Sequence, residues 1–332
     1  MSAKSSGGAG TSSSRSASST PAPTLIAVAG SNLEFNLEWD ASVGGAGSNE
    51  AGFMAAVEDA AQFFATNLTT PKLDVVNLHV GYGEVAGTTM PFGALSASSD
   101  EGDYVSYATL AAALRNVDGS PSSNPLSSYV LALPGSDPTG QASASKDFFV
   151  SYAEEKALGL PIGTSRYQTA IDGWIGLAKN SFFTKMNYSA DPLLNKSGSM
   201  PQGGYDAVGA AAHEIGEVLG RIAGLGTSLQ SGTGATWTAL DLARYTGSGA
   251  RDLTTKAGYF SLNGGATNLG TYNTSAGDAG DWASGAYDAY GAYSHSGYYS
   301  PVSATDLLET AALGFSLTPV GLADAGSPSK VV

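Results

Sequence analysis

The chain of 332 residues contains no cysteine, only three histidines and few charged side chains. The absence of cysteine excludes disulfides, thiolate metal sites and cysteine nucleophiles. Charged residues make up 13% of the chain, about half of the roughly 25% that is usual, so small polar residues and alanine must cover much of the surface. The chain has only three histidines and no G-x-S-x-G segment, so the sequence gives little support for a nucleophilic catalytic triad.

The chain also has little positive charge and no long apolar run. Its formal net charge of −14 disfavours nucleic acid or an anionic membrane as a partner. No window resembles a membrane span of about 20 apolar residues. These features fit an acidic, soluble, exported protein, which we expect to be extracellular and a monomer. Residues 1–23 lack the apolar segment of a signal peptide, so we expect the export signal to lie elsewhere or to have been removed.

The order of the expected elements predicts a single α+β domain over residues 24–318. A Ser/Gly-rich disordered tail (1–23) precedes it, and a flexible tail (319–332) follows it. Alternating or continuous apolar residues predict strands, and apolar residues at helical spacing predict helices. The expected strands are 33–39, 72–80, 129–133, 170–177, 182–188 and a hairpin over 258–272. The expected helices are 48–64, 104–115, 148–157, 207–223, a short turn within 237–245, and 304–313, while 281–299 is expected to be loop.

The most informative stretch is AHEIGEVLGR at residues 212–221. It differs by one letter from the zinc-protease signature H-E-x-x-H, because Glu217 stands where the second histidine would be. Residues four apart share one helix face, so His213 and Glu217 can approach one cation together. Imidazole and carboxylate are both zinc ligands. Glu214, about 100° round the helix, would then be the general base that deprotonates metal-bound water.

The same letters also allow a structural interpretation without a metal. Glu217 and Arg221 are four residues apart and could form an exposed ion pair on the helix. His213 could be a hydrogen-bonded histidine of the core. For the helix itself, Asp206 is the expected N-cap, and Gly224 and Gly226 are expected to end it.

Residues 205–221 resemble the active-site helix of a family of exported bacterial metalloproteases, which reads H-E-I-x-E-V-[ML]-G-R. Gly220 also matches the glycine of the metzincin pattern H-E-x-x-H-x-x-G-x-x-H, whose last histidine would fall at Ala223. No methionine follows Met200, so the chain looks like a degenerate relative of the metzincins. The similarity covers most of residues 33–315 and includes 39–42, 80–84, 172–173, 239–245, 258–261, 264–270, 280–283 and 303–307.

This resemblance implies a zincin-like fold, with a mixed twisted sheet packed on the active-site helix and a loop-rich C-terminal part. It also implies zinc-dependent cleavage of peptide bonds in polypeptide substrates. By analogy with other zincins, residues 171–177 are expected to be the sheet edge that binds an extended peptide. The alternative is a non-catalytic extracellular binding or surface protein on a degenerate protease scaffold, which the missing histidines favour and the intact Glu214 disfavours.

A catalytic zinc needs three protein ligands, and the third is expected to be Asp241. This residue lies in a segment loosely similar to the third-ligand motif of the aspzincins. Its structural alternative is a charge at a helix N-terminus, paired with Arg244. His295 is the other candidate ligand, although it lies in a loop. A carboxylate-rich site would also suit manganese or calcium, but the position of Glu214 favours zinc.

The Gly-rich loop that follows contains two further sets of candidate residues. Asp278, Asp281 and Asp288 are spaced oxygen ligands that could hold a structural calcium ion, or they could simply be solvated. The loop is also rich in tyrosine, which could line a substrate cleft or pack the loop. These tyrosines are Tyr287, Tyr290, Tyr293, Tyr298 and Tyr299.

Overall fold

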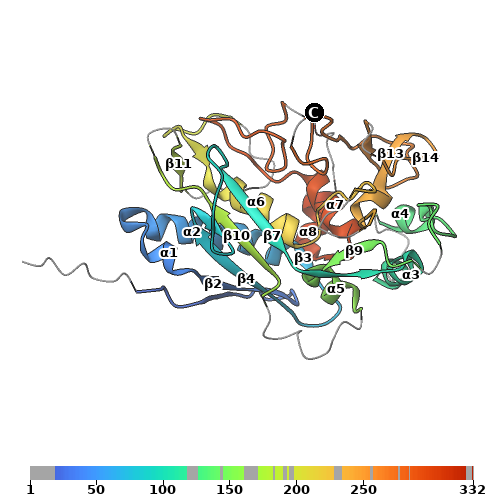
Figure 1. The fold of residues 1–332 in the computed structure, drawn as a ribbon, viewed down its shortest axis with the longest axis horizontal. Coiled ribbons are helices and arrows are strands. Elements are labelled where there is room, and N and C mark those ends of the chain that lie inside the picture. Colours follow the sequence, from blue (N-terminus) through green and yellow to red (C-terminus); the bar gives the residue numbers. More distant parts are fainter. Residues whose placement is uncertain are drawn as a thin grey trace, which may run out of the picture.

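The structure is a computed structural model that describes residues 19–117, 126–142, 145–160, 171–181, 184–189, 193, 198–227, 234–254, 257–275, 277–283, 285–326 and 331. In this part the chain is mixed α and β, with helices packed on a central five-stranded sheet (Figure 1). No helix of the described ranges is long and apolar enough to cross a membrane. Most of the expected N-terminal tail, residues 1–18, lies outside the described residues.

The central sheet has three parallel strands in the middle and an antiparallel strand on each side. Its order is β1 (Thr24–Ile26), β2 (Leu33–Trp39), β4 (Asp74–Tyr82), β10 (Gly173–Leu177) and β7 (Ser96–Asp100). The predicted strands β2, β4 and β10 are confirmed. The expectation that 171–177 forms the sheet edge is wrong, because β10 lies between β4 and β7. The edge strand next to β10 is β7, which the apolar pattern did not predict.

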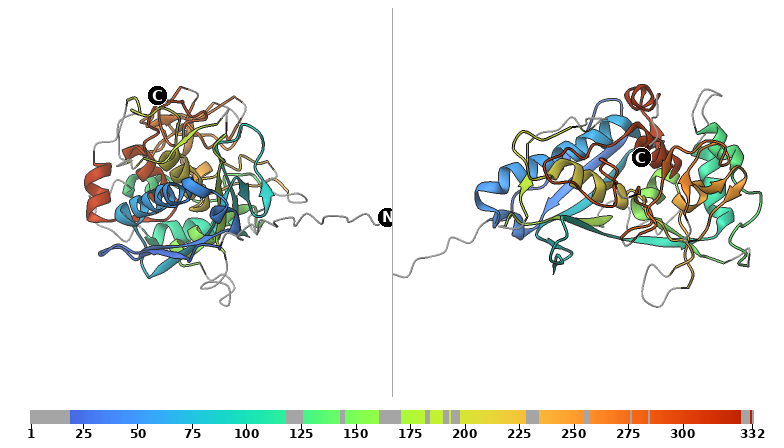
Figure 2. Two further views of the ribbon diagram at one scale, coloured as in Figure 1. Left: turned by 90° about the vertical axis from the view of Figure 1, so that its left-hand side faces the viewer. Right: turned by 90° about the horizontal axis from the view of Figure 1, so that it is seen from above.

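Two helices pack against each other and against the central sheet, α2 (Glu50–Asn67) and α6 (Ala207–Val218). Figure 2 shows both helices on the same side of the sheet. Along α2 the buried residues recur every three or four positions, so one face of the helix is apolar. The helix α6 contacts both β10 and β7. It therefore lies beneath the edge of the sheet.

The helix α6 begins where the sequence predicts and ends earlier. Asp206 caps it, because its Oδ1 accepts hydrogen bonds from the N–H groups of Val208 and Gly209. The expected end at Gly224 and Gly226 is wrong. The helix ends at Val218, and Gly220 takes a φ of +103°, a conformation that favours glycine.

Several shorter elements surround this core. They are α1 (Ala41–Gly44), β3 (Leu68–Thr69), β5 (Glu84–Val85), β6 (Thr88–Thr89), β8 (Gly102–Val105), α3 (Tyr107–Val117), α4 (Ser127–Ala132), β9 (Phe148–Ser151), α5 (Tyr152–Leu158), β11 (Met186–Asn187) and β12 (Tyr205–Asp206). Two sequence predictions are wrong here. The expected strand 129–133 lies largely within the helix α4, and the first part of the expected helix 148–157 is the strand β9.

The C-terminal part is rich in loops, as expected. Its elements are β13 (Arg244–Gly247), β14 (Ala250–Arg251), β15 (Tyr259–Phe260), β16 (Gly270–Thr271), α7 (Ala304–Ala312), β17 (Ser316–Leu317) and α8 (Pro319–Ala325), with a 3-10 turn at Leu240–Ala243. The antiparallel pair β15–β16 confirms the hairpin. Ser303 caps α7. The expected flexible tail from 319 instead begins with α8, capped by Thr318 with a proline in its first turn.

Candidate metal centre

The first two candidate ligands lie one turn apart on α6, as the sequence predicts. The distance between His213 Nε2 and Glu217 Oε1 is 3.4 Å. Both side chains are mostly buried, with 17% and 15% of their surface exposed. One cation can therefore reach both atoms from the same side of the helix.

The third group is Asp281, in the loop that precedes α7. Its Oδ1 lies 3.7 Å from His213 Nε2. The ligand atoms of His213, Glu217 and Asp281 all lie within 4.8 Å of one another. Sequence reasoning missed this role, because it considered Asp281 only as a calcium ligand. The signal that could have found it is the segment 280–283, which belongs to the resemblance described above.

Neighbouring groups hold the two helical ligands in orientation. His213 Nδ1 lies 2.8 Å from the carbonyl oxygen of Ala289. Because a carbonyl only accepts hydrogen bonds, Nδ1 carries a hydrogen and donates it, and Nε2 is the ring nitrogen that faces the two carboxylates. On the other ligand, the hydroxyl of Ser98 on β7 donates a 2.5 Å hydrogen bond to Glu217 Oε2. Such outer contacts are typical of residues that coordinate metals.

Negative charge accumulates around these ligands. Burial disfavours a charged imidazole, yet the carboxylate of Asp281 and a hydrogen bond that Glu217 accepts from the imidazole hold the pKa of His213 well above its usual value. Burial raises the pKa of Asp281 to about 7. Burial and the charge of Glu217 also raise the pKa of Asp100 well above normal, and Asp100 Oδ1 has no hydrogen-bond partner in the described part of the chain. A divalent cation would neutralise this cluster, so the donor set fits a metal ion.

Glu214 lines a cavity together with two of the three clustered residues, His213 and Asp281. The cavity has a volume of about 430 Å³ and is lined by His213, Glu214, Asp281, Ser96 and Tyr293, among others. Glu214 is 3% exposed, and its Oε2 has no hydrogen-bond partner among the described residues. Burial and the nearby Glu217 raise the pKa of Glu214 well above its usual value. A carboxylate in this position can accept a proton near neutral pH.

The exposed Glu217–Arg221 ion pair, the structural alternative, is wrong. Arg221 is buried, and its Nε donates a 2.6 Å hydrogen bond to Glu309 Oε2. Its Nη1 lies 3.6 Å from Asp281 Oδ1, and its guanidinium carbon lies 3.8 Å from the centre of the Tyr290 ring. Arg221 therefore lies beside Asp281 and interacts with the carboxylate of this third candidate ligand.

The structure does not bring Asp241 into this cluster. The residue is fully buried in the 3-10 turn, and its Oδ2 accepts hydrogen bonds from the N–H groups of Gly224, Leu225 and Thr238. Those bonds join the turn to the segment that follows α6. Arg244 acts on Asp241 through its charge, while it donates hydrogen bonds to Asp252 Oδ2 at 3.4 Å and to the carbonyl oxygen of Ala279 at 2.8 Å. Asp241 thus has a structural position.

The other candidate residues of the loop are distributed differently. His295 stacks on Tyr287, with ring centres 4.2 Å apart, and does not belong to the cluster. The expected calcium ligands are not brought together as one ligand set, since Asp281 faces His213 whereas Asp288 accepts a hydrogen bond from the N–H of Tyr290. Of the tyrosines, Tyr293 lines the cavity.

Comparisons of the chain with models of protein families, with curated proteins and with solved structures found no match. The resemblance of residues 205–221 to a metalloprotease helix therefore stays a prediction. The arguments that follow rest on the residues of this chain.

Proposed function

We propose that the protein is a zinc-dependent endopeptidase that hydrolyses peptide bonds in polypeptides. One observation carries this proposal. The ligand atoms of His213, Glu217 and Asp281 cluster together, and two of these residues, His213 and Asp281, line one cavity with Glu214. In this proposal the first three residues hold the zinc ion, and Glu214 is the general base.

A zincin-like fold is the architecture that we propose for this activity. A mixed sheet whose antiparallel edge strand lies over α6 supports it. Ser96 on this strand lines the cavity, so the free edge of β7 begins at the site. An extended polypeptide can add to such an edge through main-chain hydrogen bonds, which position a peptide bond without regard to its side chains.

The chemistry of the donor set favours zinc over harder cations. Catalytic zinc sites commonly use three protein ligands and leave one position open. Manganese and calcium prefer more oxygen ligands, and the imidazole of His213 is a better ligand for zinc. When bound, the zinc ion would polarise the scissile carbonyl group and make a water molecule more acidic.

The residues of the chain would perform the proton transfers. Glu214 accepts a proton from the attacking water and passes it to the nitrogen of the leaving amine. Burial and the nearby Glu217 raise the pKa of Glu214, which favours its uptake of the proton from water. The Ala289 carbonyl keeps the imidazole of His213 in one tautomer during these steps.

The test is cleavage of an unfolded polypeptide, such as reduced and carboxymethylated casein, by zinc-loaded protein. Glu214→Gln is expected to lower kcat/KM by roughly 100- to 10,000-fold, because general-base catalysis contributes about that much. Zinc content should stay unchanged. Glu50→Gln at the start of α2 is the matched control and should keep full activity. A Glu214→Gln variant as active as the parent would refute the mechanism.

The alternative function, a non-catalytic binding or surface protein, predicts a different result. Such a protein would be folded and inert towards every unfolded polypeptide, whatever its zinc content. The side chain of Glu214 argues against this alternative. A buried carboxylate oxygen without a partner lowers the stability of the fold, and a catalytic role would explain why the residue is there.

A further inference from the structure

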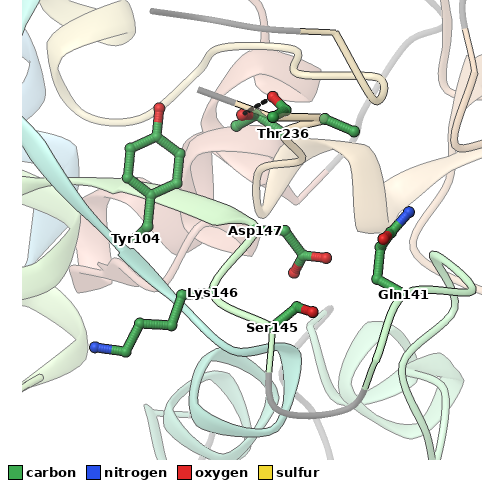
Figure 3. A pocket seen from close by; sticks show the side chains of 8 residues that line it. Tyr104, Gln141, Ser145, Lys146, Asp147 and Thr236 are labelled. Carbon is green, nitrogen blue, oxygen red and sulfur yellow. Dashed lines mark hydrogen bonds between the residues drawn. The ribbon is translucent and has the colours of Figure 1, made fainter. Parts of the chain in front are cut away.

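A second cavity lies apart from the metal centre and shares none of its lining residues. Its volume is also about 430 Å³, a size at which pockets bind small molecules. Figure 3 shows the side chains that line it. Tyr104 lies on β8, and Gln141, Ser145 and Asp147 lie in the segment before β9. Thr236 lies a few residues before the 3-10 turn at Leu240–Ala243.

Asp147 is the central polar group of this cavity. It is 8% exposed, and neither carboxylate oxygen has a hydrogen-bond partner among the described residues. In Figure 3 its carboxylate points into the space between Ser145 and Gln141. The backbone from Asp147 to Phe149 is hydrogen-bonded to Trp237, because Asp147 O accepts a hydrogen bond from Trp237 N at 2.9 Å and Phe149 N donates one to Trp237 O at 2.8 Å. The main chain that carries this side chain is therefore anchored, and the carboxylate keeps unused hydrogen-bonding capacity.

A second unpartnered polar atom belongs to Tyr104. Its hydroxyl oxygen is buried and has no hydrogen-bond partner in the described part of the chain. Its ring packs edge-on against Phe149, with ring centres 5.5 Å apart, which restricts its movement. Lys146, the one basic residue of the lining, extends away from Asp147 in Figure 3. It is thus not placed to neutralise the carboxylate.

We propose that this cavity binds an organic cation, a primary ammonium or guanidinium group on a short chain, with Asp147 accepting its hydrogen bonds and Tyr104 providing an oxygen acceptor. Ammonium and guanidinium groups only donate hydrogen bonds, which matches the unpartnered oxygens of Asp147 and Tyr104. A charged donor on a carboxylate also forms the stronger kind of hydrogen bond. The ligand would satisfy buried atoms that otherwise destabilise the fold.

The charge around the cavity supports a cation over a neutral ligand. Burial and the neighbouring carboxylate of Asp137 raise the pKa of Asp147. Both causes act against the ionised form, and a bound cation opposes both. A bare metal ion fits less well. The cluster of three metal-binding side chains found among the described residues lies at His213, and calcium needs six to eight oxygen ligands at roughly 2.3–2.6 Å.

The test is isothermal titration calorimetry with n-butylammonium and n-butylguanidinium as probes and 1-pentanol as an uncharged probe of similar size. The intact protein is expected to bind at least one of the cations about tenfold or more tightly than the alcohol. Asp147→Asn should weaken binding by roughly 10- to 100-fold, as expected for the loss of a charged hydrogen bond. Tyr104→Phe should weaken it by a smaller factor.

The control variant is Glu101→Gln, which removes one negative charge from an exposed position between β7 and β8. Its affinity should equal that of the parent. If Asp147→Asn does not fold, Tyr104→Phe decides the question. The proposal is overturned if neither cation binds, if the alcohol binds equally well, if every variant that folds keeps the parent affinity, or if calcium alone binds.

The source of the cation can be distinguished in the same experiment. N-acetyl-Gly-Lys-Gly-amide carries the same ammonium group on a peptide. Tighter binding of this peptide than of n-butylammonium would assign the site to a basic side chain of a polypeptide, and weaker binding would assign it to a free amine. Either result supports the cation site. Because no residue of this site belongs to the metal centre, the result is independent of the proposed peptidase activity.

Discussion

The helix α6 and the loop that contains Asp281 contribute to the same cluster by different means. On the helix, the spacing of His213, Glu214 and Glu217 follows from the turn of an α-helix and can be read from the sequence. The loop has no regular spacing of this kind. Asp281 reaches the cluster because Arg221 and Trp282 pack around this part of the loop. The comparison teaches that local geometry places two of the proposed ligands and that tertiary packing places the third.

The loop is held firmly although it contains no helix or named strand among its described residues. Trp282 is 1% exposed, and its Nε1 donates a 2.7 Å hydrogen bond to Asp306 on α7. Its ring stacks on Tyr272, with centres 5.2 Å apart. The backbone oxygen of Asp281 itself accepts a hydrogen bond from Asn273 N at 2.7 Å. We therefore expect both halves of the cluster to be preorganised, so that each is sensitive to substitution.

The largest expected effect is on the helical half. His213→Ala removes the imidazole of the site, and zinc affinity should fall by about 1,000-fold or more, since zinc-site affinities rest on very few ligands. Competition with a chromophoric chelator measures it. His295→Ala is the matched control and should bind zinc as the parent does. An unchanged affinity in His213→Ala would break the comparison, because the helix would then contribute no ligand.

The protonation of the two halves provides the next effect. The pKa of Asp281 is raised to about 7 by burial, and that of His213 is raised mainly by Asp281 and Glu217 against the effect of burial. Zinc binds the deprotonated forms, so protons must leave as it enters. Affinity should therefore fall as pH drops below 7, by about tenfold per pH unit for each proton displaced. Calorimetry at pH 8 and pH 6 checks this, and a flat profile would contradict it.

Asp241 allows a contrast between a structural and a ligating aspartate. Asp241→Asn keeps the shape of the side chain but weakens three hydrogen bonds from backbone N–H groups. We expect the free energy of unfolding to fall by about 1–3 kcal/mol, as for damage to a buried hydrogen-bonded group. Chemical denaturation measures the change. Zinc affinity should be the same as in the parent, and a loss of zinc in the folded variant would return Asp241 to the ligand set.

The smallest effect is expected at the edge strand. Ser98→Ala removes the hydrogen bond to Glu217 Oε2 without touching the ligand itself. Zinc affinity should fall by about tenfold, since loss of a group that orients a ligand costs about 10- to 100-fold. The exposed Ser99 offers a control, Ser99→Ala, that should change nothing. Equal affinities in both variants would separate β7 from the metal site.

The sequence predicted those parts of the fold in which a regular pattern coincides with burial. The strand β2 alternates apolar and polar residues, and each of its apolar residues is buried. The strand β7 was missed because its sequence, SASSD, contains no large apolar residue. Its position comes from pairing with β10 and from the contact between Ser98 and Glu217. Propensity alone cannot reveal a strand stabilised in this way.

The prediction of Asp241 as the third ligand was wrong for a related reason. Asp241 was chosen on local similarity, and a local motif cannot distinguish a ligand from an aspartate that binds backbone N–H groups. Asp281 lies 68 positions after His213 in a Gly-rich loop, where no spacing rule applies. Only the packing of Arg221 and Trp282 around it places its carboxylate near the histidine.

The central claim is that one zinc ion binds between α6 and the loop that contains Asp281. Elemental analysis of the purified protein, run beside Asp281→Ala and Asp241→Asn, tests it most directly. The account predicts one zinc per chain in the parent and in Asp241→Asn, and little or none in Asp281→Ala. A parent without zinc after incubation with the metal, or an Asp281→Ala variant that keeps its zinc, would contradict it.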